Sequence, residues 1–163
     1  MPILIDGHNL IGQMDDISLS DPDDEERLIE CLAAYQRRHH SQVTVVFDSG
    51  RYGGLPARPR QHASGIRILY AQPGQRADDV ICGIVRRSPD RRGWLVVSSD
   101  HAVQAEVRYL GATPIPSEQF ARQLAAMRRP PAPQEKEKPP SPSEVEEWLR
   151  IFSTPRQTPS KRR

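Results

Sequence analysis

Short apolar runs alternate with longer amphipathic segments over the first 127 residues of the chain. The runs Ile3–Ile5, Val43–Phe47, Ile66–Tyr70 and Trp94–Val97 are rich in β-branched and aromatic side chains. Such runs are typical of strands that are buried on both faces of a parallel sheet. A shorter strand is predicted at Thr113–Ile115.

The segments between these strands carry the periodicity of helices. In one of them, Leu28, Ile29 and Leu32 recur at three- and four-residue steps. Helices are predicted over residues 22–39, 78–87, 102–110 and 117–127. Alternating strands and helices favour parallel pairing with right-handed crossovers. The predicted fold class is therefore α/β, a three-layer α/β/α sandwich with a mainly parallel central sheet.

The composition changes at Arg128 and divides the chain. Residues 1–127 form the predicted domain, and residues 128–142 form a Pro-rich, charged linker that has too few apolar residues to pack. Residues 143–163 begin with a capping-box pattern and an amphipathic segment and end in a basic tail. Within the domain, residues 51–65 are read as a loop rich in Gly, Pro and Arg.

The cysteines and the hydropathy limit the class of protein. Cys31 and Cys82 lie at apolar-periodic positions outside any metal-ligand spacing, so we expect buried, reduced thiols. No apolar run approaches the roughly 18 residues of a membrane span, and the first residues lack the pattern of a signal peptide. The sequence predicts a soluble, cytoplasmic protein without a membrane partner.

The charge is distributed unevenly between the two parts of the chain. Residues 1–127 carry 14 Arg and 16 acidic residues, a net charge of −2, and contain no Lys. Residues 128–163 carry 9 basic and 5 acidic residues, a net charge of +4. The absence of Lys disfavours phosphatase and nucleotide-binding α/β proteins, because a P-loop and related phosphoryl-transfer sites need one.

Carboxylates follow the predicted strands. Asp6 and Asp48 end two of them, Asp100 follows a third, and Asp78 and Asp79 open the helix after another. The carboxyl ends of parallel strands meet at one edge of a sheet, where ligands bind. Clustered carboxylates repel one another unless a cation neutralises them, and all-oxygen sites suit Mg²⁺ or Mn²⁺. The pattern predicts a divalent-metal site.

Each acid also has a purely structural interpretation. Asp6 and Asp100 could cap the helices that follow them, Asp48 could hold a turn, and Asp78 could be a helix N-cap. Asp78 and Asp79 are adjacent on one helix and do not share a face, so at most one of them is expected to bind a metal directly.

The segments "LIDGHN", "VVFD", "ADD" and "VVSSD" resemble, in this order and spacing, the NYN branch of the PIN-like nucleases and its YacP-like bacterial endoribonucleases. The resemblance implies metal-dependent cleavage of RNA, including messenger RNA engaged with ribosomes. It gives Asp6, Asp78 and Asp100 the positions of metal-binding acids, Asp48 that of the acid after the second strand, and Asn9 that of a polar pocket residue.

The chain departs from the family pattern at two places. His8 replaces a usual Tyr, and "QPGQRADD" replaces an acidic-polar lead-in to Ala-Asp. Candidate contacts to RNA are stacking or phosphate-binding groups on the same side of the domain. They are His8, Arg51, Tyr52, Arg58, Arg60 and Arg76. A solvated loop is the alternative for the arginines, and a simple turn residue is the alternative for His8.

Two functions remain open from the sequence. The first is a metal-dependent endoribonuclease, and the second is a catalytically weak or inactive module that binds RNA or ribosomes. In the second, the essential parts would be the basic tail and the segment 143–152, which carries Val145, Trp148, Leu149 and Phe152 on one helical face. That segment is the predicted contact with a protein partner or a ribosomal surface.

Overall fold

The computed structural model describes residues 1–49, 58–128, 143 and 146. The chain divides into two compact units, Met1–Arg128 and Arg129–Arg163. The predicted linker and amphipathic segment lie outside the described residues except for Arg128, Ser143 and Glu146, and so does much of the predicted loop. Arg128 is the last residue of a helix, so the linker does not begin at Arg128 as predicted. No helix among the described residues has the length and apolar character needed to cross a membrane.

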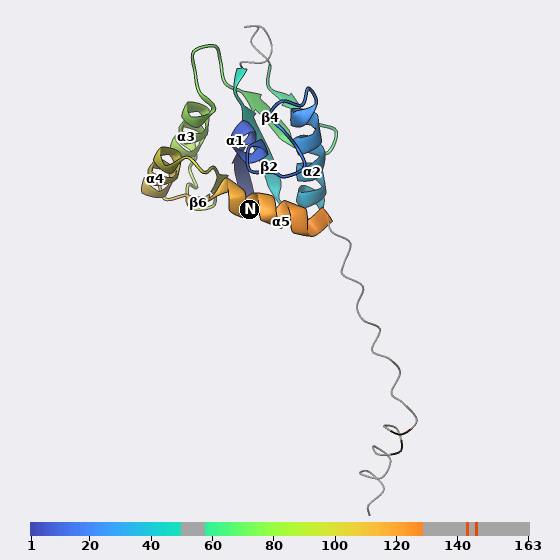
Figure 1. The fold of residues 1–163 in the computed structure, drawn as a ribbon. Coiled ribbons are helices and arrows are strands. Elements are labelled where there is room, and N and C mark those ends of the chain that lie inside the picture. The colour runs from blue at the N-terminus through green and yellow to red at the C-terminus, as the bar shows by residue number, and fades with distance from the viewer. Residues whose placement is uncertain (50–57, 129–142, 144–145, 147–163) are drawn as a thin grey trace, which may run out of the picture. The chain divides into compact units, whose positions relative to one another are not determined.

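A six-stranded sheet forms the centre of the first unit (Figure 1). Its strands, in chain order, are β1 (Pro2–Asp6), β2 (Gln42–Phe47), β3 (Arg60–Gln61), β4 (Arg67–Tyr70), β5 (Leu95–Val97) and β6 (Thr113–Ile115). They lie side by side in the order β3-β4-β2-β1-β5-β6. All neighbouring strands are parallel except β3 and β4, which are antiparallel. The predicted mainly parallel sheet is confirmed.

Within residues 1–49 and 58–128, five helices cover the two faces of the sheet. They are α1 (Gly7–Ile11), α2 (Asp24–His39), α3 (Ala77–Arg87), α4 (His101–Tyr109) and α5 (Ser117–Arg128). α1, α2 and α5 pack together on one face, and α3 and α4 pack together on the other (Figure 1). The predicted three-layer α/β/α sandwich is therefore present.

The alternation of side chains along β1 explains why its run of apolar residues is continuous. Ile3 and Ile5 join the core beneath α1, α2 and α5, whereas Leu4 joins the core beneath α3 and α4. β2 divides in the same way, with Val45 in the first core and Val46 in the second. Helices cover both faces of each central strand, so side chains on either face are buried and apolar residues are favoured at every position.

The structure differs from the sequence prediction at two elements. Residues Gly7–Ile11 form a helix that is absent from the predicted helices, and Arg60–Gln61 form an edge strand inside the predicted loop. Both elements are short, and β3 is exposed and has no apolar residue to mark it. The predicted burial of the cysteines is also too strong, because Cys31 and Cys82 are free thiols that are only half-buried.

Candidate metal centre at the carboxyl edge of the sheet

Neighbouring strands bring three acids to one edge of the sheet. Asp6 is the last residue of β1, Asp48 directly follows β2, and Asp100 follows β5 after Ser98 and Ser99. β1 lies between β2 and β5, and the three strands are parallel. Their carboxyl ends therefore lie at the same edge, and Asp78 approaches it from the first turn of α3.

Asp6 is the most deeply buried acid of this group, with 6% of its surface exposed. Its carboxylate accepts a hydrogen bond from the backbone N–H of Asn9 at 3.3 Å and so caps α1. Loss of solvent raises the pKa of Asp6 to about 7, and the nearby charges of Asp78 and Asp48 add to this effect. The hydrogen bond from Asn9 and the neighbouring His8 oppose the shift without cancelling it.

Asp78 is electrostatically coupled to the same acids. Partial burial raises its pKa above the usual value, and the charges of Asp100 and Asp48 raise it further. Arg76, whose Nη2 lies 2.9 Å from Asp78 Oδ2, opposes this shift. A hydrogen bond between the side chains of Asp6 and Asp78 also favours ionised Asp78. Asp6 and Asp78 therefore titrate as a coupled pair.

Two further acids cap the N-termini of helices. Asp48 Oδ1 accepts a hydrogen bond from the N–H of Ala77, at the start of α3, at 2.8 Å. Asp100 Oδ1 accepts from the N–H groups of Ala102 and Val103, in the first turn of α4, at 2.8 and 3.2 Å. The capping roles expected as an alternative for Asp6 and Asp100 are present, and Asp48 caps α3 in addition to following β2.

A divalent cation such as Mg²⁺ needs several oxygen ligands close together. Within residues 1–49 and 58–128, no three His, Cys, Asp or Glu side chains lie in a group that could hold a metal ion as they stand. The acids nevertheless fit in kind, because hard cations prefer carboxylate oxygens. They also fit electrostatically, because burial and the neighbouring carboxylates raise the pKa of both Asp6 and Asp78, and a cation would favour their ionised forms.

His8 is held against this edge by a buried network. Its Nε2 lies 3.1 Å from Glu25 Oε1, and its Nδ1 lies 3.4 Å from the backbone N of Asp48. The hydroxyl of Tyr70 donates to the other oxygen of Glu25 at 3.3 Å. The imidazole ring also packs on Phe47, with 5.1 Å between the ring centres. His8 is thus fixed between α2 and the acid that follows β2.

Sequence reasoning missed Glu25 and Tyr70. A signal for Glu25 existed, because it precedes Leu28, Ile29 and Leu32 by three, four and seven residues and so falls on the buried stripe of α2. A carboxylate in that position needs a partner, which His8 and Tyr70 supply. Nothing in the sequence indicates which residues those partners are.

Asn9 joins three segments behind the acids. Its side-chain oxygen accepts hydrogen bonds from the backbone N–H of Ser99 at 2.9 Å and from the hydroxyl of Ser117 at 2.7 Å. Ser117, the first residue of α5, is fully buried. Asn9 therefore positions the segment that carries Asp100, and the structure places it in a joint between elements.

The remaining predicted residues are spread over the surface. Asp79 is exposed, and its Oδ2 accepts a hydrogen bond from the backbone N–H of Arg76 at 3.1 Å, so it caps its own helix. Arg76 is 75% exposed beside Asp78, whereas Arg60 lies 3.5 Å from Glu26 on α2. Arg58 is exposed, and Arg51 and Tyr52 lie outside the described residues.

The fold and this edge define an α/β/α domain with an acidic centre at the carboxyl ends of its parallel strands. The chain belongs to the YacP-like NYN domain family, whose model matches residues 3–150. The predicted resemblance is confirmed.

Two solved structures are similar to the chain. The crystal structure of Rae1 (YacP) from Bacillus subtilis matches with a TM-score of 0.63 and 19% identity, over 93% of this chain and 81% of that one. A mutant of Rae1 matches with a TM-score of 0.61 and 20% identity, over 95% of this chain and 85% of the other. At these sequence identities the similarity is evidence for a shared fold only. No curated protein matches the chain significantly.

Proposed function

We propose that this protein is a metal-dependent endoribonuclease that hydrolyses phosphodiester bonds of RNA. The observation that carries the proposal is the arrival of Asp6, Asp48, Asp78 and Asp100 at one edge of the sheet in a domain of the YacP-like NYN family. Their mutual repulsion supports a cation-binding role, since acids whose task is only to cap helices gain nothing from lying close together.

Asp6, Asp78 and Asp100 would hold Mg²⁺ or Mn²⁺, and Asp48 would support them from the neighbouring strand. The more exposed Asp79 is the weaker candidate, because its carboxylate already caps α3. A bound divalent cation supplies positive charge that favours ionisation of a water molecule and stabilises negative charge on the leaving oxygen.

The protein's own residues would do the rest of the work. Arg76 presents a largely exposed guanidinium beside Asp78, suited to bidentate contact with a phosphate of the RNA. Asp6, whose pKa of about 7 applies to the metal-free protein, would release its proton on binding the cation. His8 and Asn9 position Asp48 and the segment with Asp100 through the hydrogen bonds described above.

The alternative is a catalytically weak or inactive module that binds RNA. One observation favours it: Asp6, Asp48 and Asp100 each cap a helix, and this gives them a structural reason to be present. The two functions predict different results for a substitution that removes the charge of an acid but keeps its ability to cap a helix. Such a substitution changes RNA cleavage only if the protein is an enzyme.

The test is cleavage of an end-labelled, single-stranded RNA by the purified protein. Endonucleolytic products should form with Mg²⁺ or Mn²⁺ and should disappear when the metal is chelated. RNA that stays intact with either ion, while it still binds the protein, would contradict the enzyme and support the binding module.

The second unit carries the proposed contact with ribosomes or a protein partner. This part of the proposal rests on the sequence of residues 143–152, with an apolar stripe of Trp148, Leu149 and Phe152, and on the basic tail. The family model extends to residue 150 and so includes most of that segment. A cytoplasmic location, where ribosomes are found, belongs to the same proposal.

Removal of residues 129–163 tests this contact and keeps Arg128, which pairs with Asp16 in the first unit. The truncated protein should cleave a short free RNA at nearly the full rate but should cosediment less with ribosomes. Equal cosedimentation and unchanged protein partners would contradict the docking role of the segment.

A further inference from the structure

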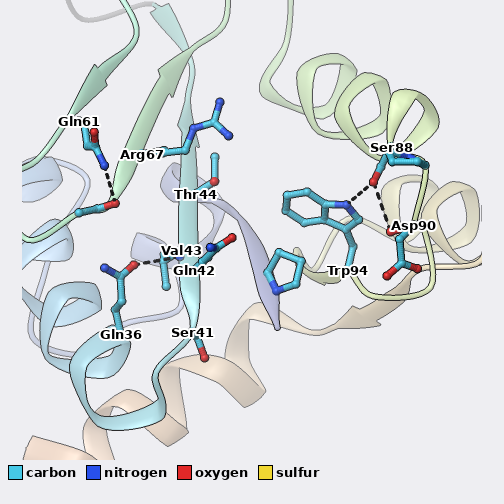
Figure 2. A pocket seen from close by; sticks show the side chains of 13 residues that line it. Gln36, Ser41, Gln42, Val43, Thr44, Gln61, Arg67, Ser88, Asp90 and Trp94 are labelled. Carbon is cyan, nitrogen blue, oxygen red and sulfur yellow. Dashed lines mark hydrogen bonds between the residues drawn. The ribbon is translucent and has the colours of Figure 1, made fainter.

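A cavity opens at the edge of the sheet opposite the acids (Figure 2). Its volume is about 430 Å³, and it lies at the amino ends of the strands, where Pro2 begins β1, Gln42 begins β2 and Arg67 begins β4. Trp94, immediately before β5, and Ser88, immediately after α3, also line it. The volume is within the range of about 300–1,000 Å³ that is usual for small-ligand pockets.

The cavity exists because α3 ends at Arg87 and leaves the amino ends of the strands uncovered. Arg67 alternates along its strand with Ile66 and Ile68, whose side chains join the core beneath α1, α2 and α5. The side chain of Arg67 therefore lies on the face of α3, where it lines the cavity together with Thr44. Figure 2 shows both opposite Trp94.

Trp94 offers a fixed aromatic surface. Its indole Nε1–H donates a hydrogen bond to Ser88 Oγ at 2.9 Å, and the side chain is half-buried against the core beneath α3 and α4. The ring lies across the cavity from Arg67 in Figure 2. An aromatic ring that a hydrogen bond already holds in place loses little conformational entropy when a flat ligand stacks on it.

The charge at this edge is positive. Arg67 is exposed, and its guanidinium makes no hydrogen bond or ion pair with any residue of the described part of the chain. Exposed arginines also surround the turn after α3, and they are Arg86, Arg87, Arg91 and Arg92. Arg86 pairs with Glu106, and the lining acid Asp90 accepts the backbone N–H of Gly93 at 3.2 Å. The unpaired guanidinium of Arg67 is thus suited to an anion.

We propose that this cavity is a second RNA subsite, in which one base of single-stranded RNA stacks on Trp94 and an adjacent phosphate pairs with Arg67. Aromatic stacking beside basic side chains is the usual way in which proteins hold single-stranded nucleic acid. Gln42, Thr44 and Ser88 supply polar groups for the edge of the base. That the ligand is RNA rests on the proposed function.

The subsite is separated from the acids by the length of the strands. β1 has five residues, so at about 3.3 Å per residue the two edges lie roughly 16 Å apart. An RNA of only two or three nucleotides is too short to use both sites. The subsite should therefore strengthen binding and cleavage of longer single strands and leave the shortest substrates unaffected.

The experiment follows the fluorescence of Trp94 in full-length protein carrying Trp148→Phe, which leaves Trp94 as the sole tryptophan. The probe is single-stranded decauridylate with the metal chelated, so that no cleavage occurs. The RNA should quench the fluorescence at saturation. Trp94→Leu, followed by anisotropy of labelled RNA, should weaken binding about 5- to 150-fold, the range for loss of one stacked base.

Arg67→Glu keeps the proposal falsifiable if Trp94→Leu does not fold, because Arg67 is exposed. This variant should bind RNA with lower affinity. The slope of the logarithm of affinity against the logarithm of salt concentration should fall in magnitude by at least about one, the value for the loss of one phosphate contact. Arg122→Glu, the same charge change at an exposed position on α5, is the matched control and should have a smaller effect.

Absence of quenching, or equal losses in Arg67→Glu and Arg122→Glu, would overturn the subsite. The failure of the proposed function is distinguishable from this result. Quenching that depends on Arg67 in a protein that never cleaves RNA would uphold the subsite and refute the nuclease. Metal-dependent cleavage without quenching would do the reverse.

Discussion

The two edges of the same sheet carry opposite chemistry. At the carboxyl edge, Asp6, Asp48 and Asp100 follow three neighbouring strands, and α1, α3 and α4 begin there. At the amino edge, α3 ends in Arg86 and Arg87, and a cavity lined by arginine and tryptophan lies beside it. Acidic side chains thus lie at the N-termini of helices, and arginine side chains lie at the C-terminus of a helix, as the helix dipole favours.

The comparison shows why an acid cluster can persist in a stable domain. The backbone N–H groups of the helices that begin at the carboxyl edge give each strand-end acid a hydrogen bond. Capping a helix and binding a cation are therefore compatible roles for one carboxylate, because a cap occupies only part of its acceptor capacity. The following predictions separate these roles.

The largest effect is expected when the carboxyl edge loses charge but keeps its caps. Asn caps helices about as well as Asp, so Asp100→Asn should leave the fold intact. Cleavage of RNA should fall by more than about 100-fold, the upper range for loss of a group that merely supports a metal ligand. Asp6→Asn should have a similar effect on activity. Initial cleavage rates at saturating metal measure both, with the exposed Asp15→Asn as control.

Retention of wild-type rates in both variants would remove these acids from the catalytic centre and leave them as caps. An Asp15→Asn variant as slow as Asp100→Asn would show that the loss of rate reflects net charge and has no specific origin at this edge.

The next effect concerns the pH dependence of stability in metal-free protein. Asp6 has a pKa of about 7 in the folded state against a usual value of 3.8. Between about pH 4 and 7, the folded state holds a proton that the unfolded chain releases, so stability should fall as the pH rises through this window. Asp6→Asn should remove on the order of 2 to 4 kcal/mol of that fall. Urea unfolding at several pH values, with chelator, measures it.

A difference between wild type and Asp6→Asn that is the same at pH 4 and pH 8 would contradict the burial and repulsion assigned to this carboxylate. The sign of the pH dependence is diagnostic. If a cationic partner stabilised the ionised carboxylate, the protein would instead lose stability as the pH falls.

A smaller effect on stability is expected when a substitution disturbs the packing beneath the acids. A Cβ at Gly7 would lie 2.2 Å from Phe47 Cε1, and Phe47 supports the ring of His8. Gly7→Ala should therefore destabilise the domain by about 1 to 3 kcal/mol through overpacking. Gly12→Ala is the matched control, since its nearest neighbours lie 3.6 Å away, and it should be close to neutral. Equal free energies of unfolding for the two variants would refute this close contact.

The smallest effect is expected at the network behind His8. Tyr70→Phe removes one hydrogen bond to Glu25, which keeps its contact with His8. We expect a loss of about 1 kcal/mol in the free energy of unfolding. Cleavage should change little, because Tyr70 supports the edge from a distance. A loss of activity as large as that of Asp100→Asn would instead place Tyr70 in the chemistry.

The strands and the long helices followed from the sequence because their apolar periodicity matches burial on two faces. The meeting of the acids followed from parallel topology, which places the ends of β2, β1 and β5 together. α1 could not be predicted in the same way, because Gly7, His8 and Asn9 are residue types that also form turns. A five-residue helix becomes stable here through the Asp6 cap and the burial of Leu10 and Ile11.

Long-range pairs were also beyond the sequence. Tyr70 lies 45 positions from Glu25, and Asn9 lies 108 positions from Ser117, so no local pattern joins them. Trp94 was read only as the start of a strand. Its place beside the cavity depends on where α3 ends relative to β2 and β4, and this is a property of the assembled fold.

The central claim is that the carboxylates at the end of the parallel strands form a divalent-metal site, and calorimetric titration with Mn²⁺ tests it most directly. The wild-type protein should bind Mn²⁺ saturably at concentrations below roughly 10 mM, above which even weak protein sites for such ions are filled. Asp78→Asn should lose this binding, and Arg67→Glu at the opposite edge should keep it. A wild-type protein that binds no Mn²⁺, or an Asp78→Asn variant that binds it as tightly as wild type, would contradict the account.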